Sequence, residues 1–172
     1  QKLLPPKIKR DTNSPKKVVP EGLWSKCESC EAVLYRADLE KNLHVCPKCA
    51  HHIRISARER LDYLLDLEGR YEIGAEVAPV DSLKFKDSRR YTERLEEART
   101  DTSEEDALVV MQGSIKTIPV VAAGFEFGFL GGSMGSVVGE RFIRGVQVCL
   151  EQRLPFICIT ASGGARMQEG LL

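Results

Sequence analysis

The chain has 172 residues, of which 42% are hydrophobic, and its 25 basic side chains are balanced by 25 acidic ones. This composition is too apolar for a disordered chain, and the neutral balance gives no general case for a polyanionic partner or an anionic membrane surface. No apolar run reaches the roughly 18 residues of a transmembrane helix, and the first 20 residues lack a signal-peptide core. We therefore expect no membrane insertion and a cytoplasmic location.

Residues 1–21 are basic and interrupted by prolines. Six lysine or arginine side chains occur here against two acidic ones, and four prolines lie among them. Such a mixture is typical of a flexible basic arm rather than of a packed element.

Residues 22–55 carry four cysteines in the spacing Cys-x2-Cys-x15-Cys-x2-Cys: Cys27, Cys30, Cys46 and Cys49. Each pair can form a tight knuckle, and in a reducing compartment this arrangement favours a tetrahedral zinc ion over disulfides. Four protein ligands leave no position for an activated water, so we expect one structural zinc ion. The nearby histidines, all between residues 44 and 52, are not needed as ligands. We predict a small β-rich zinc ribbon with strand-like stretches at 34–35 and 43–45.

A zinc ribbon behind a basic arm leaves nucleic-acid binding open as a second function, because phosphate contacts need only well-placed cations. Acidic side chains in the same module weaken this alternative, and the single tryptophan, Trp24, offers little stacking surface. We keep nucleic-acid binding as a secondary hypothesis.

Two helices are predicted between residues 56 and 106, one that starts at the Ser56 cap and one in the charged stretch 79–106. Ser56 and Glu59 have the spacing of a capping box, an apolar stripe from Ala57 to Leu65 follows, and Gly69 marks the stop. Charges of both signs dominate residues 79–106, a pattern that favours a solvated helix over a binding stripe.

Residues 107–160 show the pattern of a buried α/β unit. Two β-rich runs at 107–111 and 119–123, separated by Gly113 and a turn at Lys116 and Thr117, predict a hairpin. A helical pattern starts after Gly135 and contains Gly139 and Gly145, which suggests close packing against another backbone. A strand is predicted at 155–160. Hairpin, helix, strand and glycine loop make one ββα unit and the start of a second.

Two glycine-rich loops are the candidate chemical sites: Gly131-Gly-Ser-Met-Gly135 and Ser162-Gly-Gly-Ala165. Neither fits a dinucleotide fingerprint or a phosphate loop. Each alone is equally compatible with a tight turn and with an anion-binding turn. The second loop lies between a strand and a helix start, where adjacent amides can converge on a developing oxyanion.

At these residues the chain resembles the β subunit of the bacterial acetyl-CoA carboxylase carboxyltransferase. The similarity covers about residue 20 to the last residue and includes six blocks in order: 20–27, 46–49, 82–88, 106–111, 131–139 and Ala161-Ser-Gly-Gly-Ala-Arg-Met-Gln-Glu169. It implies an α/β (α+β) fold of the crotonase or ClpP-like type, a superhelix of ββα units, incomplete here and preceded by the four-cysteine zinc ribbon. Residues 56–172 would be the N-terminal part of the carboxyltransferase domain.

The resemblance also implies an activity: transfer of a carboxyl group from carboxybiotin on a carrier protein to acetyl-CoA, giving malonyl-CoA for fatty acid biosynthesis. The implied partners are the carboxyltransferase α subunit in an α2β2 assembly, the biotin carboxyl carrier protein and biotin carboxylase. Carboxyl transfer needs backbone donors for an enolate, and the biotin nitrogen can serve as base, so no catalytic side chain is assigned. The candidate substrate-binding groups are the amides of Gly131, Gly132, Gly163, Gly164 and Ala165.

Members of this family continue through a further glycine-pair loop that this sequence does not contain, and their α subunit supplies a matching site. We therefore expect the chain to be a truncated or partly ordered β subunit, inactive by itself. A related acyl-CoA carboxylase or decarboxylase subunit remains a second alternative, because it would keep the fold and change the substrate.

Overall fold

The computed structural model describes residues 22–170, and the predicted basic arm of residues 1–21 lies outside the described residues. The chain divides after Arg54 into two compact units, next to the predicted boundary. The first unit carries the four cysteines and the second carries both glycine-rich loops. Among the helices of residues 22–170, none combines the length and apolar character needed to cross a bilayer.

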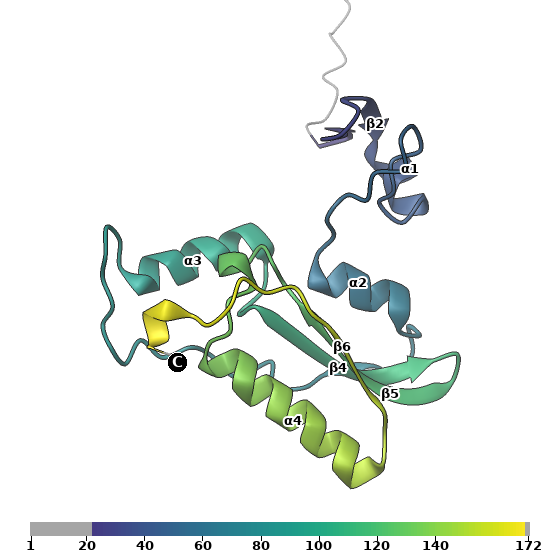
Figure 1. Ribbon diagram of the computed structural model, residues 1–172. Coiled ribbons are helices and arrows are strands. Elements are labelled where there is room, and N and C mark those ends of the chain that lie inside the picture. The colour runs from purple at the N-terminus through teal and green to yellow at the C-terminus, as the bar shows by residue number, and fades with distance from the viewer. Residues whose placement is uncertain (1–21, 171–172) are drawn as a thin grey trace, which may run out of the picture. The chain divides into compact units, whose positions relative to one another are not determined.

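The cysteine-bearing unit consists of one short hairpin and one short helix (Figure 1): β1 (Trp24–Lys26), β2 (Val33–Tyr35) and α1 (Arg36–Lys41). The two strands are antiparallel, and Trp24 lies opposite Tyr35. The core is small and consists of Cys27, Leu34, Leu39 and Cys46. Such a core cannot stabilise a module of this size without further help.

The prediction for this unit was wrong in two places. Helix α1 was not predicted, and residues 43–45 do not form a strand. Leu43 and His44 have φ of 50° and 57°, in the left-handed region that a β-strand does not contain. Val45 alone forms a bridge, to His52.

The second unit is built on a four-stranded sheet in the order β3-β4-β5-β6 (Figure 1). Its strands are β3 (Tyr71–Glu72), β4 (Leu108–Ile115), β5 (Ile118–Phe125) and β6 (Phe156–Ile159). The first three are antiparallel, and β6 is parallel to β5. The predicted hairpin and the following strand are thus confirmed, except that Gly113 lies within β4 and not in the turn.

The hairpin turn is the two-residue turn that was predicted. Lys116 and Thr117 both have positive φ, 48° and 69°, which matches the twist of the two strands. The Asp66 carboxylate accepts hydrogen bonds from the amides of both residues and from the Ser114 hydroxyl. These bonds hold the pKa of Asp66 below its ordinary value. Because Asp66 serves the turn, helix α2 ends at Leu64, before the predicted stop at Gly69.

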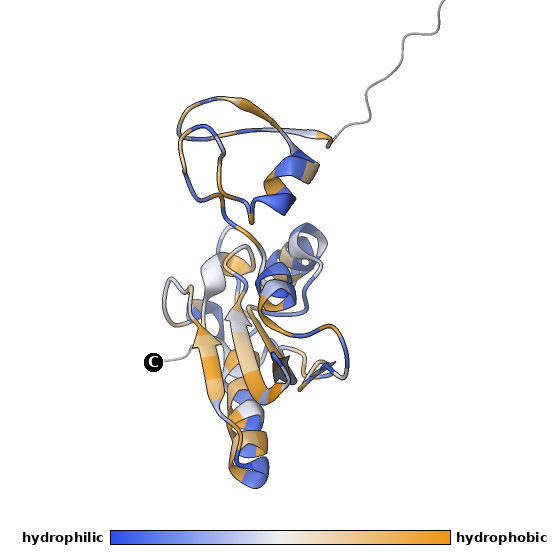
Figure 2. Ribbon diagram, turned by 90° about the vertical axis from the view of Figure 1, so that its right-hand side faces the viewer, coloured by the Kyte–Doolittle hydropathy of each residue, from blue (hydrophilic) through white to orange (hydrophobic). Residues whose placement is uncertain are grey.

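The sheet has a helical layer on each face, and the alternation of strand residues decides which layer each side chain meets. On one face Val109, Met111, Val120 and Ala122 pack against helix α2 (Ala57–Leu64). On the other, Leu108, Val110, Val121 and Ala123 pack against helices α3 (Tyr91–Thr102) and α4 (Ser136–Gln152). Figure 2 shows the hydrophobic residues concentrated in the strands between these layers.

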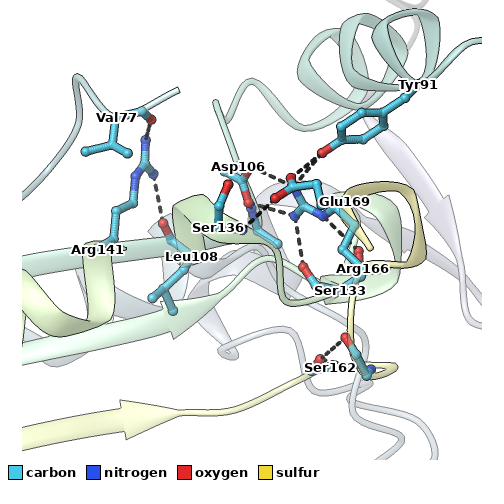
Figure 3. A network of polar contacts seen from close by, with 12 residues as sticks. Val77, Tyr91, Asp106, Leu108, Ser133, Ser136, Arg141, Ser162, Arg166 and Glu169 are labelled. Carbon is cyan, nitrogen blue, oxygen red and sulfur yellow. Dashed lines mark hydrogen bonds and ion pairs between the residues drawn. The ribbon is translucent and has the colours of Figure 1, made fainter. Parts of the chain in front are cut away.

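Two polar side chains, Ser56 and Arg141, hold parts of these layers in place. Ser56 caps α2 and accepts the Glu59 amide hydrogen bond at 3.1 Å, as the capping box predicted. Arg141 of α4 is almost fully buried and donates to the main-chain carbonyls of Leu108 and Val77 (Figure 3). The segment before α3 is therefore attached to the sheet.

Candidate functional site

The four cysteines of the first unit converge, as predicted. Their Sγ atoms all lie within 4.8 Å of one another, and the Cys27–Cys49 and Cys30–Cys46 pairs are each 3.7 Å apart. A tetrahedral zinc ion with Zn–S bonds of about 2.3 Å separates its sulfurs by about 3.8 Å. The residues present therefore fit a zinc ion bound by four thiolates.

The two knuckles have the same backbone geometry. Glu31 follows the first cysteine pair with φ of 58° and donates its amide to the Cys27 carbonyl. Ala50 follows the second pair with φ of 59° and donates to the Cys46 carbonyl. The repetition is what two equivalent halves of one metal site require.

Main-chain amides favour the thiolate form of the first cysteine in each knuckle, Cys27 and Cys46. Burial by itself raises the pKa of the Cys46 thiol, but the amides of Lys48 and Cys49 lower it to about 7. Amides of Cys30 and Ser29 lower the pKa of Cys27 in the same way. The Ala32 amide acts to lower the pKa of Cys30, but the neighbouring sulfurs and burial raise it to about 12. Thiolates are the form that binds zinc, so the lowered pKa values of Cys27 and Cys46 suit metal ligands.

In the second unit the structure brings the two glycine-rich loops together, although about thirty residues separate them. Met134 and Ala165 form a parallel bridge in which the Met134 amide donates to the Gly164 carbonyl at 2.8 Å. Beside it, the Gly163 amide donates to the Gly131 carbonyl at 2.9 Å. A Cβ atom at Gly132 would lie 2.1 Å from the Ala161 carbonyl oxygen, so only glycine allows this approach.

Of the five amides predicted as substrate donors, some already donate hydrogen bonds within the loops. The Gly132 amide donates to the Phe129 carbonyl and the Gly164 amide to the Ser162 hydroxyl, in addition to the Gly163 bond. Three amides are therefore engaged within the loops, and Gly131 meets the second loop through its carbonyl. The Ala165 amide has no hydrogen-bond partner within residues 22–170, because the bridge uses its two neighbours.

Arg166, which follows directly, is the centre of a buried polar network (Figure 3). Arg166 and Asp106 are both fully buried and form a bidentate ion pair with distances of 2.7 and 2.8 Å. The same guanidinium donates to the Ser133 carbonyl at 2.8 Å and to the Tyr91 hydroxyl at 3.1 Å. Burial acts to lower the pKa of Arg166, but the Asp106 carboxylate and the Tyr91 hydroxyl raise it, so the guanidinium stays charged.

Glu169 closes the network on its other side (Figure 3). Its carboxylate accepts the Tyr91 hydroxyl at 2.6 Å and the Ser136 amide at 2.7 Å, at the first turn of α4. Burial acts to raise the pKa of Glu169, but these two hydrogen bonds lower it below its ordinary value. The Ser162–Glu169 loop is thereby attached to α3, α4 and the start of β4.

An apolar hollow of about 650 Å³ lies beside the bridge, at the ends of the parallel strands β5 and β6. Its walls come from both strands, helix α4 and both loops, and include Phe125, Val138, Phe142, Cys158, Thr160 and Ala165. Burial raises the pKa of the Cys158 thiol, so this sulfur is not an activated nucleophile. The site can thus accept an apolar group next to the unengaged Ala165 amide.

Comparison with known protein families identifies this unit. Residues 77–172, more than half of the chain, match the family model described as carboxyl transferase domain. The chain belongs to this family. Residues 24–49 match a second model, the acetyl-CoA carboxylase zinc finger domain, which contains all four cysteines of the metal site.

Solved structures of carboxyl transferase proteins show the same fold. Two structures of transcarboxylase 12S, one with methylmalonyl-coenzyme A and methylmalonic acid bound, are 30% and 31% identical over 68% of this chain, each with a TM-score of 0.54. The match covers 21% and 20% of those chains, so this chain spans about a fifth of their length. A single-chain, multi-domain long-chain acyl-CoA carboxylase, 22% identical over 64% of this chain and 11% of its own, shares the fold at a TM-score of 0.50.

The predicted mixed α/β, crotonase-like fold with an N-terminal four-cysteine ribbon is thus confirmed. Within this carboxyl transferase domain, sequence reasoning missed the side chains that hold the loop, namely Tyr91, Asp106, Arg166 and Glu169. One signal was available: Arg166 and Glu169 are charged residues in a loop flanked by apolar strand and glycine. Asp106 lies 60 residues from Arg166, and Tyr91 lies 75 or more residues from both Arg166 and Glu169, so these pairs could not be predicted from spacing.

Proposed function

We propose that the protein is the β-type subunit of a biotin-dependent carboxyltransferase that carboxylates acetyl-CoA to malonyl-CoA, in the cytoplasm and for fatty acid biosynthesis. One observation supports it most: a single chain combines a carboxyl transferase domain with the zinc finger found in acetyl-CoA carboxylase. We infer that it works with a carboxyltransferase α subunit, a biotin carboxyl carrier protein and biotin carboxylase.

The proposed substrate site is the bridge between the two glycine loops. A thioester oxygen next to Ala165 would accept a hydrogen bond from the unengaged Ala165 amide. This hydrogen bond would stabilise the negative charge that develops on the oxygen when a methyl proton leaves. Gly132, Gly163 and Gly164 would shape the loop, and Gly131 would hold it through its carbonyl. Carboxybiotin supplies the carboxyl group and, through its ring nitrogen, the base. No histidine or carboxylate is among the described residues that line the hollow.

The zinc ion has a structural role in this proposal. Cys27, Cys30, Cys46 and Cys49 would hold it, and with four sulfurs bound it has no open position for substrate. Its binding energy would replace the core that residues 22–54 lack.

Acceptor selectivity tests the proposal. We expect the full-length β chain that contains these residues, assembled with its α subunit and supplied with carboxybiotinylated carrier, to form malonyl-CoA from acetyl-CoA at a higher kcat/KM than methylmalonyl-CoA from propionyl-CoA. The reverse order would assign the chain to another acyl-CoA carboxylase. Absence of carboxylation with every acyl-CoA would overturn the proposal.

Nucleic-acid binding by the ribbon stays a second candidate because Trp24 and Tyr35 form an exposed aromatic pair with ring centroids 5.3 Å apart. Bases can stack on such a surface. A titration with single-stranded oligonucleotide at increasing salt decides this, because phosphate contacts predict affinity that falls steeply with salt.

A further inference from the structure

A small basic pocket lies outside the glycine-loop site, in the segment that leads into helix α3. It has a volume of about 310 Å³ and is lined by Asp81, Lys84, Phe85, Lys86, Arg90 and Thr92. We propose that this pocket binds the phosphate groups at the nucleotide end of a coenzyme A thioester. The assignment to coenzyme A rests on the proposed function. The phosphate chemistry rests on the pocket itself.

The backbone places two cations side by side. Lys86 and Arg90 are partners in an antiparallel bridge, so their side chains leave the backbone on the same side at neighbouring positions. The loop between them is closed by the Asp87 amide, which donates to the Arg89 carbonyl at 3.2 Å. Like charges in opposed positions repel each other, and an anion between them removes the repulsion.

The acidic side chains nearby are engaged elsewhere. Arg94 holds the Asp87 carboxylate with two hydrogen bonds of 2.8 Å and lowers the pKa of Asp87 to about 2. Arg89 pairs with Glu97 at 2.8 Å. The Glu93 carboxylate accepts the Arg90 amide.

The net charge of the side chains that line the pocket is positive. Asp81 is the one acidic group in its wall, and its carboxylate already accepts the Phe85 amide at 3.0 Å. Within residues 22–170, Lys84, Lys86 and Arg90 have no ion-pair partner. Three positive charges and the Thr92 hydroxyl are therefore available to a phosphate, for which lysine and arginine form the strongest hydrogen bonds.

The pocket is attached to the glycine-loop site. Tyr91 follows Arg90 directly, is fully buried, and donates its hydroxyl to Glu169. The Leu83 side chain comes within 3.0 Å of the position that a Cβ atom would take at Gly170. The segment that carries the basic pocket is thus attached to the loop that carries Ala165, and the proposal places the two ends of one extended ligand at these two positions.

Binding of adenosine 3′,5′-bisphosphate to the whole zinc-loaded chain, measured by isothermal titration calorimetry, tests the pocket independently of turnover. The pocket variant is Lys84→Asn with Lys86→Gln. The matched control is Arg60→Gln with Lys116→Asn, which removes two exposed cations from the same unit, and asparagine suits the positive φ of residue 116. We expect the pocket variant to bind about tenfold more weakly and the control to bind like the wild type.

Equal weakening in both variants would overturn the proposal, because it would show only a general charge effect. Equal binding of adenosine, which has no phosphates, would overturn it too. Tighter binding of a single-stranded oligonucleotide through the same two lysines would replace coenzyme A by nucleic acid as the ligand.

An activity measurement separates this inference from the proposed function. In the assembled enzyme we expect the pocket variant to raise KM for acetyl-CoA about tenfold and to leave turnover of acetyl-pantetheine, which lacks the nucleotide, unchanged. Carboxylation with the same KM in wild type and variant would refute the pocket alone. Binding of the nucleotide without turnover of any thioester would refute the assignment to coenzyme A.

Discussion

At the scale of single residues, the glycine loop depends on a buried ion pair. Arg166 and Asp106 are both fully removed from water, and burial of two charges is unfavourable unless every donor and acceptor is satisfied. Here the guanidinium contacts Asp106, Tyr91, Ser133 and Glu169. The ion pair therefore fixes the position of the loop that contains Ala165. Removing one partner leaves the other charge buried and unpaired.

We predict that Arg166→Met lowers the unfolding free energy of residues 55–170 by about 3–5 kcal/mol, since it leaves the Asp106 carboxylate buried without its ion-pair partner. Arg144→Met is the control, because Arg144 is also paired but its side chain is 39% exposed. This second change should lower stability by about 1 kcal/mol or less. Urea unfolding of both variants checks the difference, and equal losses would contradict the role given to Arg166.

Glu169 predicts a pH dependence. Its pKa is lower in the folded protein than in the unfolded chain, so its contribution to stability is complete above about pH 5 and is lost as the pH falls through the folded-state value. We expect Glu169→Gln to be less stable than wild type at pH 7, with a difference that shrinks toward pH 3. Amide hydrogen exchange in β4 and β5 measures this unit, because the only tryptophan, Trp24, lies in the other one. A constant difference across this range would contradict the assignment.

At the scale of elements, the two glycines of helix α4 have different causes. A Cβ atom at Gly145 would lie 2.9 Å from Val110 Cγ1 and 3.0 Å from Phe156 Cε2, so this glycine lets the helix pack on the sheet. The packing predicted from sequence is present, but against side chains and not against backbone. Nothing lies within 4 Å of the corresponding position at Gly139.

Alanine at these two positions should therefore have opposite effects. Gly145→Ala forces the sheet and helix apart and should destabilise by about 1–3 kcal/mol, more than the gain in helix propensity. Gly139→Ala meets no obstruction and should stabilise by about 0.5–1 kcal/mol. Thermal unfolding of the two variants is the measurement, and a shift in the same direction for both would show that the packing account is wrong.

Local signals predicted the elements whose causes are local. The Ser56–Glu59 cap, the Lys116–Thr117 turn and the strand at 155–160 follow from short-range chemistry and were confirmed. Helix α2 ends early because Asp66 is used by a turn 50 residues away, a contact that periodicity cannot show. The left-handed backbone at residues 43 and 44 could likewise not be predicted, because the apolar residues there resemble a strand.

At the scale of the whole molecule, two units with separate cores depend on different forces. The convergence of the four sulfurs could be predicted, because the two cysteine pairs repeat at the spacing of a tetrahedral zinc site. For the glycine-loop site, the sequence predicted the location but not which amides remain available. Which amides stay available depends on the Met134–Ala165 bridge, a tertiary contact that the sequence does not encode by any short-range pattern.

Metal removal should distinguish the units. We expect a strong chelator to unfold residues 22–54, which changes Trp24 fluorescence, while amides of β4 and β5 keep their protection from exchange. Zinc binding supplies on the order of 10–16 kcal/mol to small zinc modules, far more than a core of four residues can. Cys46→Ser should reproduce the effect without chelator. Unchanged fluorescence after verified removal of zinc would contradict a structural role.

Biotin-dependent carboxyl transfer can be measured in the reverse direction, which needs neither carrier protein nor biotin carboxylase. The protein and its α subunit are incubated with carboxyl-labelled malonyl-CoA, with and without free biotin. We expect acetyl-CoA to form only when biotin is present and the label to appear on biotin. Loss of the label as carbon dioxide at the same rate without biotin would identify a decarboxylase and rule out carboxyl transfer to biotin.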